Sequence, residues 1–398
     1  MHLAFCGQTA LHLTRAVRSG LAGRLSLESH EPLRSPDPGS GRRRFTTKLL
    51  TNVLLGGTFP LPLDQPLEVA APCRASRPQA KLFKSTVYGS RIPNDAFVSL
   101  GDGFQVSSPE LLFIEMASVM PLFNLVLLGC ELCGTYSRNP DDPLDGEVVF
   151  GVQPATNVQA MQAFAQRCSH LPSSRRACEA MHYVMDNAWS PMEAVVATLA
   201  VLPPEHFGYG LGPVVLNERV GVSAAASHTT RLPDMMLGGT MTGLNYDGEN
   251  HLDLDSVVNS VVRLMLDPGS EHLSGELTKS ARAVREKYVD DRRRDRELWA
   301  SGRAVFVVTY EDLVERGGLD RVMALVMDSM EQRDGVDLSW QRAALAPEFL
   351  RRKRQELVWS ALPGELGRKT RRRLAASRRQ GRASQRVYEY SIKVNTNR

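Results

Sequence analysis

A short polar segment in the second half of the chain has the residue types that bind a metal ion. In the sequence GLNYDGENH, Asn245, Asp247 and Glu249 occupy alternate positions, and His251 follows them. Alternate residues of a β-strand point to one face of the sheet, so a strand here would place these three side chains together. Asp234 precedes them by about a dozen residues, a spacing that fits a hairpin bringing its carboxylate to the same end.

Carboxylate and amide oxygens gathered at a strand end are suited to Mg²⁺. This ion prefers hard oxygen ligands, and in phosphodiester hydrolysis it neutralises developing negative charge and activates water. His251 is then a candidate general acid or base, although a histidine at such a place is as often a surface or packed residue. The segment also has a simpler interpretation, because its Asp-Gly pair is a common hairpin turn and acidic turns are often solvated.

A helix is predicted to begin directly after Ser190. Ser190 is a suitable N-cap, Pro191 suits the first helical position, and Glu193 stands where a capping box has its acidic residue. The apolar run AVVATLAVL continues this helix until two prolines end it. Glu193 therefore has two candidate roles, as a capping residue and as a further metal ligand.

From this helix onward, predicted helices and strands alternate. Their order is helix, three strands, two helices, strand and helix, which predicts an α/β domain with a central mixed sheet flanked by helices. The predicted elements are a helix at 191–202, strands at 214–222, 234–237 and 242–247, helices at 253–266 and 275–301, a strand at 303–309 and a helix at 313–330.

The preceding part of the chain predicts a smaller α+β domain. The segments LEVAA, AFVSL and FQVSS have strand composition, and SSPELLFIEMASVMPLFNLVLLG has the length and apolar content of a helix pair. The length of 398 residues is too great for one ordinary core. We expect an α+β domain over 1–180, an α/β domain over 181–335, and a basic, partly disordered tail over 336–398.

The charge of the chain is unevenly distributed. Lys and Arg greatly outnumber Glu after residue 350, in runs such as RRKR and GRKTRRR, while the rest of the chain is net acidic. Such a tail can bind nucleic acid through its phosphates or can simply be solvated. The Arg292–Arg294 run has the same two interpretations, since neighbouring aspartates can form ion pairs with it on a solvated helix face.

Hydropathy and cysteine usage predict a cytoplasmic protein. The sequence has no uncharged apolar run near the length of a membrane span, and its first residues have no continuous apolar stretch typical of a secretory signal. The CxxC pair of Cys130 and Cys133 has no second pair at similar spacing, so buried reduced thiols are favoured over a zinc site. We therefore expect no membrane partner.

The second half of the chain resembles the endonuclease-like domains related to very-short-patch-repair (Vsr-type) nucleases. The segments that carry the resemblance are SPMEAVVATLAVLPPEHFGYGLGPVVLNERV, LPDMML, GLNYDGENH and YVDDRRRDRELWASGRAVFVVTYEDL, in this order over about residues 190–325. These domains belong to the PD-(D/E)xK restriction-endonuclease-like fold. The resemblance implies DNA as a partner, Mg²⁺ as the cofactor and phosphodiester hydrolysis as the reaction.

The family's site residues map onto the chain one by one. Glu193 matches the acidic residue of the early helix, Asp234 the metal-binding aspartate of the Pro-Asp strand, and Asp247 with Gly248 the Asp-Gly pair. His251 matches the histidine that follows. The charged helix is matched by three further residues: Asp291, Arg294 and Asp295.

Two positions depart from the family pattern. Asn245 stands where the family has glutamate, and Val307 stands where relatives often have arginine. An amide oxygen can coordinate Mg²⁺ but brings no charge, so a site of Asp234, Asn245 and Asp247 should bind the ion more weakly. The expected function is thus DNA binding through the nuclease-like fold, with a Mg²⁺-dependent cleavage that these two departures compromise. The alternative is a non-catalytic regulator that uses the nuclease fold to hold DNA or a protein partner.

The first half of the chain resembles, more faintly, AbiEi-like type IV antitoxin and regulator proteins. The pair Thr9-Ala10 and the helix start Ser108-Pro109-Glu110 carry this resemblance, with strands between them. It implies an α+β regulatory domain and supports the non-catalytic alternative.

Overall fold

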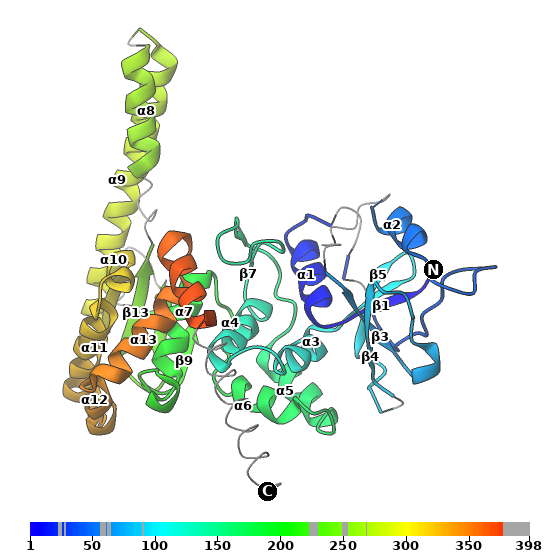
Figure 1. Ribbon diagram of the computed structural model, residues 1–398. Helices are drawn as coiled ribbons and strands as arrows, with labels where there is room; N and C mark the ends of the chain where they lie inside the picture. The colour runs from blue at the N-terminus through cyan, green and yellow to red at the C-terminus, as the bar shows by residue number, and fades with distance from the viewer. Residues whose placement is uncertain are drawn as a thin grey trace, which may run out of the picture.

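The computed structural model shows a mixed α/β protein with sheets flanked by helices, which confirms the predicted fold class (Figure 1). The structure describes residues 1–22, 26–27, 29–55, 61, 65–89, 91–222, 230–248, 254–267 and 269–376. None of the described helices combines the length and the apolar character needed to cross a membrane.

The first part of the chain is built on a six-stranded mixed sheet. Its strand order is β2-β5-β6-β1-β3-β4, in which β1 pairs parallel with β6 and antiparallel with β3. The strands are β1 (Leu3–Phe5), β2 (His30–Glu31), β3 (Leu67–Ala71), β4 (Phe83–Val87), β5 (Phe97–Gly101) and β6 (Phe104–Ser107).

Helices cover this sheet and connect it to the second part of the chain. The prediction of a helix beginning after Ser108 is confirmed, because the Ser108 hydroxyl accepts a hydrogen bond from the amide of Leu111. The elements are α1 (Gly7–Arg18), α2 (Thr47–Leu55), α3 (Pro109–Met116), α4 (Leu122–Leu132), α5 (Val158–Arg167) and α6 (Ser174–Met181), with a short pair of strands, β7 (Tyr136–Ser137) and β8 (Val149–Phe150).

The second part contains a four-stranded mixed sheet of order β14-β13-β12-β9. Strand β12 pairs antiparallel with β9 and β13, and β13 pairs parallel with β14. Its elements are α7 (Pro191–Val201), β9 (Val214–Leu216), β10 (Val220–Gly221), β11 (Thr230–Arg231), β12 (Met235–Leu237), β13 (Thr242–Asp247), α8 (Leu254–Leu266), α9 (Glu271–Ala300), β14 (Ala304–Thr309), α10 (Tyr310–Val314), α11 (Gly318–Asp334), α12 (Ser339–Leu345) and α13 (Glu348–Ala361).

Two predicted elements are each divided in the structure. The strand expected at 214–222 is interrupted after β9, because Asn217 adopts a left-handed conformation with φ 51°. The helix expected at 313–330 is divided into α10 and α11 at Gly317, whose φ is 72°. Left-handed backbone conformations end regular helices and strands, and glycine and asparagine adopt them most readily.

The two sheets share one contiguous group of buried side chains. It runs from Leu3 of β1 to Val358 of α13, and α7 packs against α4 as well as against β9 and β13. Part of the basic C-terminal region joins this core. The guanidinium of Arg354, only 2% exposed, donates from Nε to Oδ1 of Asp320 at 2.8 Å and lies over the ring of Tyr209.

The described cysteines are all free thiols, and Cys130 and Cys133 of the CxxC pair are buried. Burial raises the pKa of the Cys130 thiol to about 12 and raises that of Cys133 as well. These thiols are therefore neutral and unreactive at physiological pH, as the sequence predicts.

Candidate functional site

The hairpin of β12 and β13 brings Asp234 beside Asn245. Met235 pairs with Leu244 in the antiparallel register, so Asp234 lies just before β12, across from Asn245. The Asp234 amide donates to Oδ1 of Asn245 at 2.9 Å, and the Tyr246 amide donates to Oδ2 of Asp234 at 2.6 Å. The proximity expected from the hairpin spacing is therefore observed, and hydrogen bonds fix both side chains to backbone.

The side chain of Asn245 is buried and its oxygen is already used. Asn245 is 1% exposed, and its Oδ1 accepts the Asp234 amide, while its Nδ2 finds no hydrogen-bond partner among the described residues. A carboxylate at this position could accept the same amide without leaving a donor buried. The structure thus gives Asn245 a definite task, which is to hold the start of β12 against β13.

Glu193 is placed by the predicted capping box at the start of α7. Its amide donates to the Ser190 hydroxyl at 3.2 Å, and its Oε2 accepts the Trp189 amide at 2.6 Å. The N-cap role of Ser190 is therefore confirmed, whereas the Glu193 carboxylate accepts the amide of the residue before the cap rather than that of Ser190 itself. The side chain is only 4% exposed, although most capping-box glutamates lie at the surface of a helix start.

Two effects raise the pKa of the Glu193 carboxyl to about 7. The larger is burial, which disfavours the charged form, and the negative charge of Asp234 adds to it. The hydrogen bond from the Trp189 amide, which fixes the side chain, lowers the pKa in part because it stabilises the charged carboxylate. Glu193 and Asp234 are therefore close enough to interact electrostatically.

Asn217 is a member of this group that the sequence does not reveal. Its Nδ2 donates to Oε2 of Glu193 and to the carbonyl of Asn187, both at 3.0 Å, and its amide donates to the Asp234 carbonyl at 2.9 Å. Its Oδ1 is buried and has no hydrogen-bond partner among the described residues. The available signal is an asparagine directly after an apolar strand, since asparagine tolerates a left-handed bend.

The remaining residues of the polar segment are only partly described. Asp247 ends β13 opposite Thr309 of β14, two residues from Asn245 and so on the same face of the strand. Glu249 and His251 lie outside the described residues. Across the described ranges, no group of three or more His, Cys, Asp or Glu side chains is placed to hold a metal ion.

The charged helix of the resemblance forms mainly local ion pairs. Arg294 pairs with Asp291 at 3.3 Å and Arg292 with Asp295 at 3.5 Å, each three residues apart on α9. Another aspartate of this helix, Asp290, pairs with Arg231 of β11 at 3.2 Å. The aspartates therefore neutralise part of the arginine run, as expected for a solvated helix face.

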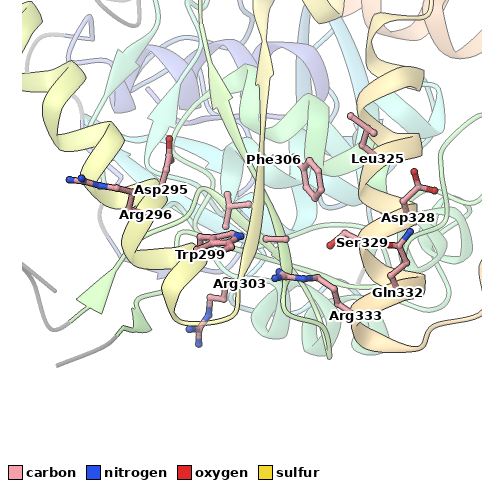
Figure 2. A pocket seen from close by; sticks show the side chains of 12 residues that line it. Asp295, Arg296, Trp299, Arg303, Phe306, Leu325, Asp328, Ser329, Gln332 and Arg333 are labelled. Atoms are coloured by element: carbon pink, nitrogen blue, oxygen red, sulfur yellow. The ribbon is translucent and has the colours of Figure 1, made fainter. Parts of the chain in front are cut away.

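A groove of about 670 Å³ runs along β14, between α9 and α11 (Figure 2). The side chains of Trp299, Phe306 and Leu325 give it apolar walls, and Asp328 and Arg333 lie at its α11 side. None of the residues that line it belongs to the group around Glu193 and Asp234. The groove is thus a separate feature on the edge strand of the sheet.

The residues that carry the fainter N-terminal resemblance have structural contacts. The Thr9 hydroxyl accepts the Glu68 amide at 2.9 Å, Ser108 caps α3, and the Glu110 carboxylate accepts from the Thr156 hydroxyl. These contacts hold the first sheet and its helices together.

The donor set around Glu193 fits a divalent cation in part. Two carboxylates lie close enough to repel each other, and the buried Asn217 Oδ1 adds an oxygen that lacks a donor. A bound cation would offset the repulsion between the carboxylates and would take the Asn217 oxygen as a ligand. The Asn245 oxygen, in contrast, accepts the Asp234 amide.

Comparison with known proteins finds no family model, no curated protein and no solved structure that matches this chain.

Proposed function

We propose that this chain binds DNA, and that its second part uses Glu193 and Asp234 to hold Mg²⁺ for phosphodiester hydrolysis. The observation that supports the proposal is the link through Asn217, which donates from its side chain to Glu193 at the start of α7 and from its amide to the carbonyl of Asp234 at the start of β12. The charge of Asp234 also raises the pKa of the Glu193 carboxyl. Carboxylates placed together in a buried environment are costly unless a cation or a proton compensates them.

Each residue of the proposed site has a distinct contribution. Asp234 and Glu193 supply the charge that binds Mg²⁺, Asp247 adds a carboxylate at the end of β13, and Asn245 fixes the position of Asp234. When bound, Mg²⁺ supplies the positive charge that stabilises a phosphodiester undergoing attack. His251 is proposed as the group that transfers a proton.

DNA binding through phosphates would rest on exposed arginines. Some of the C-terminal basic residues are already engaged, since Arg354 pairs with Asp320, and Arg368 and Arg371 pair with Asp145. Exposed arginines on α9 and in the C-terminal region remain for phosphate contacts, including Arg293 and Arg372. Binding through such contacts should weaken steeply as salt rises.

A second candidate function is a non-catalytic regulator that holds DNA or a protein partner. The observation that favours it is the state of Asn245, whose neutral side chain is committed to a backbone amide where the nuclease-like pattern has a glutamate. A cytoplasmic location fits either function, because the described cysteines are free thiols.

Plasmid nicking in Mg²⁺ or Mn²⁺ distinguishes the two functions. The informative variant is Asp234→Asn, which keeps an oxygen for the Tyr246 amide and removes the charge, and the matched control is Asp141→Asn, whose carboxylate is 77% exposed. We expect metal-dependent nicking by the wild type and by the control, and its loss in Asp234→Asn. Nicking that survives in Asp234→Asn would refute the site, and DNA binding without nicking in either metal would support the regulator.

A further inference from the structure

The connection between β13 and β14 contains a helical hairpin that extends from the fold. These parallel strands are adjacent, yet the chain between them forms α8 and the 30-residue α9. A helix of this length spans about 45 Å. Figure 1 shows α8 and the first part of α9 projecting away from both sheets. We call this projection, the described residues 254–267 and 269–288, the arm.

The second part of α9 is attached to the body of the protein. There, Arg231 of β11 pairs with Asp290 and Glu297, and Leu298 is buried. The first part of α9 packs along α8. The arm is therefore supported at its base and exposes its other faces.

An apolar stripe lies exposed along α8. Val258, Val262 and Met265 follow each other at helical spacings of four and three residues, with Leu266 beside them. Their exposed fractions are 56%, 50%, 74% and 82%. Val261 and Leu264, in contrast, are partly buried. The apolar surface of α8 is thus wider than one partner helix covers, and an uncovered stripe of this kind marks an interaction surface.

Charge is segregated along the same arm. The tip contains three acidic residues, Asp267, Glu271 and Glu276, against one basic residue, Arg263, in the last turn of α8. The shaft, closer to the body, has a run of exposed basic residues interrupted by one glutamate: Lys279, Arg282, Arg285 and Lys287. One end of the arm is therefore negative and the other is positive.

We propose that the arm pairs with the arm of a second copy of this chain, in antiparallel orientation around a two-fold axis. In this arrangement the acidic tip of each copy lies beside the basic shaft of the other, and the two apolar stripes of α8 bury each other. A two-fold interface must be self-complementary, and the segregated charges meet this requirement only in the antiparallel orientation. The apolar stripe and the acidic tip fit a protein surface better than a phosphate backbone. The inference does not depend on the proposed cleavage activity.

Reciprocal charge reversal tests the pairing on the full chain. A tip variant, Glu271→Lys with Glu276→Lys, makes the whole arm positive, and a shaft variant, Lys279→Glu with Arg282→Glu and Arg285→Glu, makes it negative. Each variant alone should repel itself, so we expect dimers for the wild type and at least a tenfold weaker association for each variant, measured by sedimentation velocity.

Mixing the two variants provides the decisive result. A heterodimer of the tip and shaft variants restores both attractive contacts, so an equimolar mixture should recover the mass of the wild-type dimer. A chain that combines all five reversals should dimerise by itself for the same reason. A monomeric wild type, or a mixture that stays monomeric, would overturn the proposal. A shaft variant that loses DNA binding while keeping the wild-type mass would also overturn it, because the shaft would then serve DNA.

A substitution in the stripe separates apolar contact from charge. Met265→Glu changes a side chain that is 74% exposed, so the fold should persist while the dimer dissociates. The matched control is Leu21→Glu, at a position 56% exposed outside the arm, which should leave the dimer intact. Equal effects of both substitutions would contradict an interface on the arm.

Discussion

Glu193→Gln removes a buried carboxylate whose protonation is coupled to folding. The folded protein raises the pKa of this group from an ordinary 4.5 to about 7, mainly by burial. Between these two pH values the folded state binds a proton that the unfolded state has released. The stability of the wild type should therefore fall as the pH rises from about 4.5 to about 7, and stay low above that.

The size of the effect follows from the difference between the two pKa values. A change from 4.5 to about 7 corresponds to roughly 3 kcal/mol, which is an upper limit because local relaxation admits water. Glutamine has no such proton to lose, and its oxygen can still accept the Trp189 amide. Glu193→Gln should thus resemble the wild type at pH 5 and exceed it by up to about 3 kcal/mol at pH 8.

Urea unfolding followed by tryptophan fluorescence measures this difference. All four tryptophans of the chain lie between Trp189 and Trp359, so the signal reports the second part of the protein. The matched control is Glu147→Gln, which changes an exposed glutamate and should keep the pH dependence of the wild type. If Glu193→Gln and the wild type lose the same stability between pH 5 and pH 8, the assignment of this buried carboxylate is wrong.

Two further predictions concern the hairpin and the first helix. Asn245→Asp should destabilise the metal-free protein by about 1–2 kcal/mol, because it adds a charge beside Asp234, and should tighten Mg²⁺ binding about tenfold or more in a thermal shift titration. An unchanged Mg²⁺ affinity would argue against a cation beside Asn245. Gly7→Ala should lower the stability of the first part by about 2 kcal/mol or more, since the added Cβ would lie 1.9 Å from Oε2 of Glu68 and φ is +55°. Gly20→Ala is its control, because Gly20 has a similar φ of +72° with nothing within 4 Å, and equal losses in circular dichroism melts would exclude the steric cause.

The elements around the site could be predicted because their signals are local. Ser190, Pro191 and Glu193 specify the start of α7 within four residues, and the structure has the expected cap, in which the Ser190 hydroxyl accepts the Glu193 amide. The alternation in GLNYD likewise predicts β13, and its pairing with β12 places Asp234 beside Asn245. Short-range hydrogen bonding and period-two alternation determine both features.

The contacts that define the site could not be predicted, because they join residues distant in the sequence. Asn217 meets Glu193 only because it bends out of β9 in a left-handed conformation. A single sequence also gives no indication that Arg354 leaves the basic run to be buried and to pair with the partly buried carboxylate of Asp320. The contacts of Asn217 and Arg354 both depend on which residues tertiary packing brings next to them.

The hydrogen bond between Asn245 and the Asp234 amide bears on how strongly the proposed site can bind Mg²⁺. Its oxygen holds the start of β12, so replacing a carboxylate with an amide preserves the geometry of Asp234 while removing one charge. An amide at this position brings no charge, so the proposed site should bind Mg²⁺ less tightly than a site with a carboxylate there. The two proposed functions therefore share one structure and differ in whether Mg²⁺ occupies it.

Anomalous diffraction from crystals soaked in Mn²⁺ tests the cation site most directly, since Mn²⁺ accepts the same oxygen ligands as Mg²⁺. We expect an anomalous peak between the carboxylates of Glu193 and Asp234, at metal–oxygen distances of roughly 2.1–2.2 Å, and its absence in Asp234→Asn. A saturating soak without a peak there, or with its peak at other residues, would contradict the account.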